Sequence, residues 1–126
     1  MNRMNMLTLK ATADAAGDGT KATTSSVHGS IKAVYVKYDA ASAAGTDVTL
    51  TDSFGQAIVT LTNANTTVML YPRTAAQDNA GADLVYLSTD TAVVSTEFSF
   101  YGNLTLTIAD QTAAKAVEVF ILYESA

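Results

Sequence analysis

Short segments in which apolar and polar residues alternate run along most of this chain of 126 residues. Leu104, Leu106 and Ile108, for example, would point to one side of an extended segment, and Thr105 and Thr107 to the other. A period of two is typical of a β-strand with one buried face. About eight or nine such segments recur at a spacing of roughly 8–12 residues, which predicts an all-β sandwich or barrel.

The expected strands are bounded by glycine, asparagine, aspartate or proline residues, which favour turns. They cover residues 26–39, 46–51, 56–62, 66–71, 84–88, 93–101, 104–108 and 116–123. Asp52-Ser53-Phe54-Gly55 has the composition of a turn, and Asn63-Ala64-Asn65 and Gly102-Asn103 have that of hairpin connections. We therefore expect antiparallel strands joined by short turns.

The first 25 residues differ from the rest of the chain. Residues 4–12 alternate weakly and fit either an edge strand or an extended arm, and residues 13–24 show no periodicity and indicate a mobile loop. Charge is uneven as well, because residues 1–37 carry five bases and two acids, whereas residues 38–126 carry two bases and ten acids. The sequence therefore predicts an N-terminal arm over residues 1–25 and a β-sandwich domain over residues 26–126.

A mildly basic arm rich in methionine is suited to lie on an acidic partner surface. The residues expected to contact that partner are Arg3, Met4, Met6, Lys10 and Lys21. The acidic body disfavours nucleic acid and anionic membranes as partners. No apolar run of about 18 residues exists to cross a membrane, and the first six residues lack the apolar segment of a signal peptide.

Residues that could perform catalysis are few. The chain has no cysteine and one histidine, His28, whose place at the start of an expected strand indicates a solvated or edge position. No Gly-x-Ser-x-Gly turn is present, and one histidine with scattered aspartates does not make a zinc site. Two oxygen-rich stretches, residues 14–20 and 78–83, fit either a weak calcium loop or ordinary polar turns. We therefore expect no catalytic, cofactor-binding or metal-binding residues.

Two segments, residues 34–38 and 117–123, are apolar on both faces. A strand of this kind is central in a sheet or lies in an interface. Because monomers rarely leave a large apolar patch open to water, we expect the chain to associate with itself. The residues expected to do so are Val36, Tyr38, Phe120 and Leu122.

Five stretches of strand and turn follow one another along the chain: Gly29–Asp39, Ala43–Leu50, Tyr71-Pro72-Arg73, Tyr101–Ile108 and Val117–Glu124. In this order they resemble a group of small structural proteins of tailed phages that are encoded among the head genes. The resemblance spans about residues 27–124 and includes no catalytic motif. It implies a jelly-roll-like antiparallel β-sandwich that decorates or cements a capsid, commonly as a homotrimer. No functional residue carries over individually.

The expected function is that of a non-enzymatic virion structural protein on the capsid surface, with the major capsid protein as its partner. Each copy would add contacts across a seam between capsid subunits, and many copies would sum weak contacts into strong attachment. Two alternatives remain open: a head–tail connector or tail component, and a carbohydrate-binding β-sandwich on the virion surface. An enzyme is the third and weakest alternative.

Overall fold

The computed structural model describes residues 3–85 and 93–125, which contain strands and connections but no helix. No segment of this part therefore forms a helix that could cross a membrane. The strands are β1 (Arg3–Thr12), β2 (Gly19–Ala22), β3 (Val27–Tyr38), β4 (Asp47–Thr51), β5 (Ala57–Leu61), β6 (Val68–Leu70), β7 (Arg73–Ala75), β8 (Ser95–Glu97), β9 (Ser99–Gly102), β10 (Thr105–Ala109) and β11 (Ala116–Ser125).

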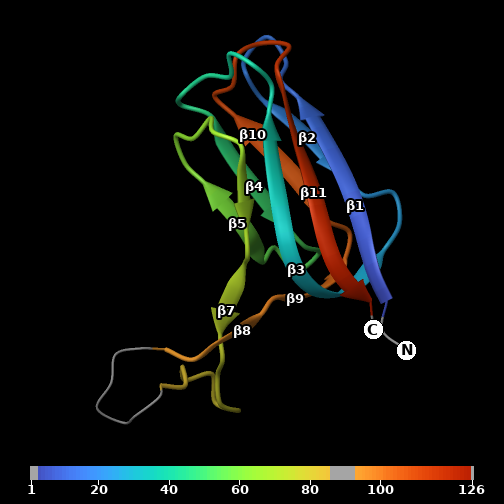
Figure 1. Cartoon of the computed structure of the whole chain (residues 1–126), viewed down its shortest axis with the longest axis vertical. Helices are drawn as coiled ribbons and strands as arrows, with labels where there is room; N and C mark the ends of the chain where they lie inside the picture. Colours follow the sequence, from blue (N-terminus) through green and yellow to red (C-terminus); the bar gives the residue numbers. More distant parts are fainter. Residues whose placement is uncertain (1–2, 86–92, 126) are drawn as a thin grey trace.

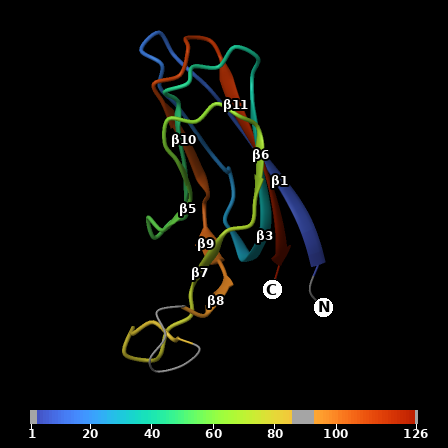
Figure 2. The same cartoon turned by 60° about the vertical axis from the view of Figure 1, so that its left-hand side comes forward.

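Two antiparallel sheets face one another, and Figure 2 shows these two layers from the side. The first sheet has the strand order β1-β11-β3-β6, with β9 also paired to β3, and the second has the order β2-β10-β4-β5. Without β9, this is the strand order of a jelly roll, in which the chain repeatedly crosses from one sheet to the other. The expected all-β antiparallel sandwich is confirmed.

The hydrophobic core lies between the two sheets and takes alternate residues from each strand. Its most completely buried side chains are Ile31, Val34, Val36, Val48, Leu50, Leu104, Leu106, Ile108, Val117, Val119 and Ile121. Burying one such aliphatic side chain stabilises the folded state by about 1.5–3 kcal/mol. The predicted inward positions of Leu104, Leu106 and Ile108 are confirmed.

The N-terminal residues belong to the sandwich. All ten residues of β1 pair with β11, from Arg3 opposite Ser125 to Thr12 opposite Ala116, and β2 pairs with β10. Leu9 and Ala11 are buried in the core. The structure therefore places residues 3–12 in the first sheet and residues 19–22 in the second, which corrects the predicted arm and its boundary at residue 25. The alternation of β1 looked weak because methionines occupy outward positions that are usually polar.

The connections between strands agree with the predicted turns in only one of three places. Asp52 joins β4 to β5 within one sheet, and its carboxylate accepts hydrogen bonds from the backbone N–H groups of Phe54 and Gln56, both at 3.0 Å. Residues 63–65 and 102–103, by contrast, carry the chain from one sheet to the other. The predicted hairpins at these two places are wrong, because a turn composition does not say where the next strand pairs.

A long excursion, defined here as the described residues 71–85 and 93–97, leaves the sandwich between β6 and β9 and projects from one end of it (Figure 1). Within it β7 pairs with β8, and none of its described residues is buried. The Nζ atom of Lys32 on β3 lies 2.9 Å from the Oε2 atom of Glu97, which ties the base of the excursion to the first sheet. The strand expected over residues 84–88 lies partly outside the described residues, and Val85 forms a single bridge with Val93.

Candidate interaction surface

The outer face of the first sheet is the side that points away from the core. Because side chains alternate along a strand, the pairing register decides which residues share this face. They are Met4, Met6, Thr8 and Lys10 of β1, Glu118, Phe120, Leu122 and Glu124 of β11, Ala33, Tyr35 and Lys37 of β3, and Met69 of β6.

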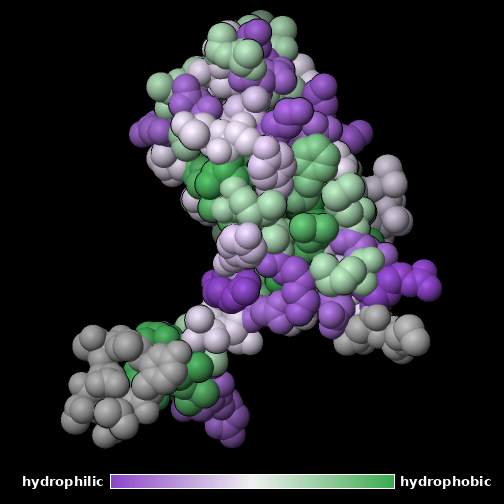
Figure 3. All heavy atoms as spheres, viewed as in Figure 1, coloured by the Kyte–Doolittle hydropathy of each residue, from purple (hydrophilic) through white to green (hydrophobic). Residues whose placement is uncertain are grey.

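An apolar patch occupies the middle of this outer face, and we define it as Met6, Tyr35, Met69, Phe120 and Leu122. Together with Lys37 these residues line an open hollow of about 410 Å³. The rings of Tyr35 and Phe120 pack at 5.9 Å with a tilt of 41°, whereas Met6 remains 60% exposed. Figure 3 shows hydrophobic residues gathered at mid-height of the sandwich, with hydrophilic residues above and below them.

Charged residues border the apolar patch at both ends. At one end, Glu118 of β11 lies in register between Lys10 of β1 and Lys37 of β3. At the other end, the Nζ atom of Lys32 lies 4.0 Å from the Oε2 atom of Glu124. Each end therefore has an acid on β11 and a base on β3.

The base at the second end is also held by the excursion. Lys32 Nζ donates a hydrogen bond of 3.0 Å to the Oε1 atom of Glu97, and this bond raises the pKa of the Lys32 ammonium group above its ordinary value. Arg73, opposite Glu97 in the β7–β8 register, lowers the same pKa in part. The ammonium group is therefore paired with a carboxylate of the same chain.

The four residues predicted to drive self-association fall on two different faces. Phe120 and Leu122 lie in the apolar patch, as described above. Val36 and Tyr38 are buried in the core, where they lie in register with Val119 and Val117. The prediction that they contact a second copy is wrong, because alternation along β3 directs Val36 and Tyr38 to the core side of the sheet and Tyr35 to the outer side.

Burial has a consequence for Tyr38. Its hydroxyl oxygen has no hydrogen-bond partner among the described residues, and burial raises the pKa of the phenol above its ordinary value. This side chain therefore contributes packing to the core and is not placed for contact with a partner.

The five residues predicted to contact a partner through the arm are also separated. Met4, Met6 and Lys10 are on the outer face of the first sheet, and Arg3 lies at the end of β1. Lys21 belongs to β2 in the second sheet and borders a groove at the sandwich edge that Leu7 and Leu9 also line. The five therefore do not form one contact surface.

Sequence reasoning missed Tyr35 and Met69 as members of the patch. Tyr35 lies between the buried residues Val34 and Val36 and is therefore directed outward, opposite Phe120 on β11 and Met69 on β6. The phase of the alternation on β3 would have identified Tyr35. Met69 could not be found this way, because the partner strand of β6 is known only from the fold.

His28 and the oxygen-rich stretches have local structural roles. His28 is exposed on β3, and its ring lies 5.9 Å from that of Tyr101 on β9. The Oδ1 atom of Asp14 accepts hydrogen bonds from the backbone N–H groups of Asp18 and Ala16, and these bonds lower the pKa of the carboxyl group. Asp78 closes its own loop in the same way. Both stretches are therefore polar turns, and no cluster of three potential metal ligands occurs within residues 3–85 and 93–125.

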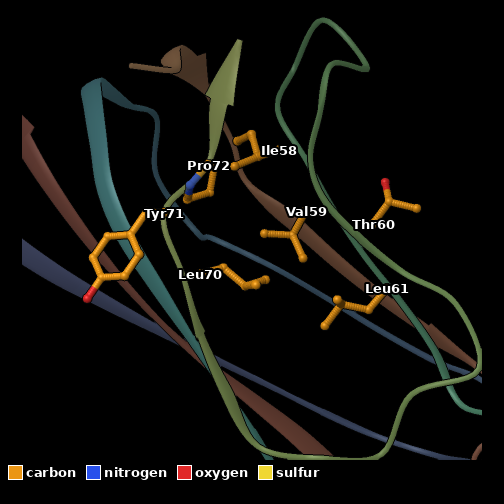
Figure 4. Close-up of a pocket in the computed structure, with 7 residues that line it drawn as sticks. All are labelled: Ile58, Val59, Thr60, Leu61, Leu70, Tyr71 and Pro72. Carbon is orange, nitrogen blue, oxygen red and sulfur yellow. The ribbon is translucent and has the colours of Figure 1, made fainter. Parts of the chain in front are cut away.

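A second hollow, of about 240 Å³, lies where the sandwich opens between β5 and β6. Figure 4 shows Leu70 and Val59 pointing toward one another across it, while Tyr71 points to the other side. Its lining is aliphatic apart from Thr60 and Tyr71. The hollow is therefore a gap at the edge of the core with no charged group to hold a polar ligand.

Comparison with known proteins places the chain in no family: no family model, curated protein or solved structure matches it.

Proposed function

We propose that this chain is a non-enzymatic virion structural protein of the decoration or cement type, which binds the major capsid protein on a tailed-phage head. The resemblance of residues 27–124 to small phage head proteins motivates the proposal. The sandwich with a jelly-roll strand order is compatible with it.

The observation that carries the proposal is the excursion. It exposes Leu84 by 44% and Val93 by 40%, and none of its described residues is buried. A two-stranded hairpin is marginally stable in water by itself. Contact with a neighbouring protein would cover these side chains, and a segment that projects from a rigid sandwich can reach across a seam between capsid subunits.

Particle composition tests this proposal. Virions made from the genome that encodes this chain are purified, and the protein is counted by quantitative mass spectrometry and located by cryo-electron microscopy. We expect hundreds of copies on the outside of the head, since a decoration protein follows the repeated symmetry of the shell. About a dozen copies at the head–tail junction would instead show a connector. Absence from the particle would overturn the proposal.

A pair of variants tests the role of the excursion in the same particles. Leu84→Asp adds a charge to the exposed excursion, and Thr60→Asp adds the same charge to an exposed position of β5 on the second sheet. Leu84→Asp should weaken binding to particles that lack the protein by at least about tenfold, because binding would then have to bury the new carboxylate without a partner. Thr60→Asp should bind as the unmodified protein does. Equal binding by all three would show that the excursion is not the anchor.

A further inference from the structure

The outer face of the first sheet carries a pattern that is complementary to itself. Along β11 the outward residues are an acid, two apolar residues and an acid: Glu118, Phe120, Leu122 and Glu124. Along β3, Lys37, Tyr35 and Ala33 lie opposite the first three of these residues. The second base is Lys32, which has no partner in the register because it lies at the bulge, and its Nζ atom lies 4.0 Å from the Oε2 atom of Glu124. The neighbouring strands thus carry opposite charges at both ends of one apolar patch.

We propose that this face docks against the same face of a second copy of the chain, around a two-fold axis that runs parallel to the strands between β3 and β11. Such an axis places β11 of one copy over β3 of the other, and the reverse, as an isologous contact requires. Glu118 of one copy then faces Lys37 of the other at one end. Each strand of the second copy keeps the direction of the same strand in the first, so the facing strands β11 and β3 are antiparallel and their axes are aligned, as in the aligned packing of two sheets.

The same two-fold rotation also brings the apolar residues of the two copies together. Phe120 of one copy lies over Tyr35 of the other, and Leu122, a large side chain, lies over the small Ala33. Met6 of β1 and Tyr71, which follows β6, meet at the flanks, and both are more than half exposed in the single chain. Facing sheets pack about 10 Å apart with interdigitating side chains, so alternation of large and small residues favours close contact.

The face is small for a protein–protein interface. Four strands about 4.8 Å apart and seven residues at about 3.4 Å each cover roughly 450 Å² in projection. Side-chain relief adds to this area, which places the contact at the small end of specific interfaces. Contacts of this size are typical of weak or transient association, and we expect a dissociation constant on the order of 1–100 μM.

Reversal of the charges at one end of the patch tests the two-fold dimer. The end with Glu118 and Lys37 is used, because Lys32 at the other end already forms a salt bridge with Glu97. Glu118→Lys alone places two lysines opposite one another in each contact, and Lys37→Glu alone places two glutamates there. Each variant should therefore weaken dimerisation at least about tenfold in sedimentation velocity. A mixture of the two variants restores opposite charges across both contacts, and should form a heterodimer as tightly as the unmodified protein.

Two further measurements keep the test conclusive. Thr60→Lys on the second sheet is the matched control and should leave the dimer unchanged, and thermal unfolding checks that each variant is folded. A monomeric unmodified protein at several hundred micromolar, a trimer as the phage resemblance implies, or a mixture that stays monomeric would each overturn the two-fold arrangement. These measurements use purified protein alone, so their failure is distinct from a failure to find the chain in virions.

Discussion

The sandwich and the excursion are built from similar residues and differ in what covers them. Val119 of β11 is fully buried between two sheets, whereas Leu84 of the excursion is 44% exposed. Each sandwich strand has a core on one side, but the β7–β8 pair has no second layer. The comparison teaches that the burial that stabilises the fold lies in the sandwich, and that the described residues of the excursion contribute little of it.

Removal of β1 should destabilise the sandwich more than any other change proposed for it. Deletion of residues 1–12 exposes one edge of β11 and removes Leu9 and Ala11 from the core. Because β11 is the central connection between β1 and β3, we expect loss of a cooperative unfolding transition in circular dichroism. A truncated protein that melts at the temperature of the full chain would show that β1 is dispensable, as a peripheral arm would be.

Two neighbouring residues of β11 separate the core from the outer face. Ile121 is fully buried, so Ile121→Ala should lower the free energy of unfolding by about 2–5 kcal/mol through lost burial and a cavity. Leu122→Ala, the control on the outer face, should cost less than about 1.5 kcal/mol at concentrations where the chain is monomeric. Chemical denaturation measures both, and equal costs would contradict the assignment of the two faces.

Shortening of the excursion should change stability little. Ala75 lies opposite Ser95 in the β7–β8 pair, so residues 76–94 can be replaced by Asn-Gly, which favours a two-residue hairpin turn. We expect the free energy of unfolding to change by less than about 1 kcal/mol, because no described residue in this part is buried. A large loss of stability in the same denaturation experiment would show that the excursion supports the sandwich.

The smallest expected effect concerns acid. The carboxyl group of Asp14 has its pKa lowered from 3.8 by hydrogen bonds from backbone N–H groups, so its charged form stabilises the loop between β1 and β2. This contribution is present above the unfolded pKa and is lost as the pH falls through the lower folded pKa. Asp14→Asn should therefore be less stable than the unmodified protein at pH 6, and the difference should shrink below about pH 4. An unchanged difference in denaturation at both pH values would contradict this role.

The apolar patch shows which surface residues strand alternation alone can identify. Phe120 and Leu122 could be identified as surplus apolar residues, because β11 is apolar on both faces. The same reasoning groups Val36 and Tyr38 of β3 with Phe120 and Leu122, although Val36 and Tyr38 lie on the core side of the sheet. Assignment of a strand's faces needs its partner, and Tyr35 joined the patch only through its register with Phe120.

The sequence by itself determined the all-β class, most strand positions and the inward residues of strands such as β4 and β10. These features depend on local alternation, which neighbouring residues encode. Tertiary structure alone decided that β1 lies in the first sheet, that residues 63–65 and 102–103 cross between sheets, and that the excursion leaves the sandwich. The physical reason is that strand pairing joins residues far apart in the chain, such as Arg3 and Ser125, and a local pattern carries no information about a distant partner.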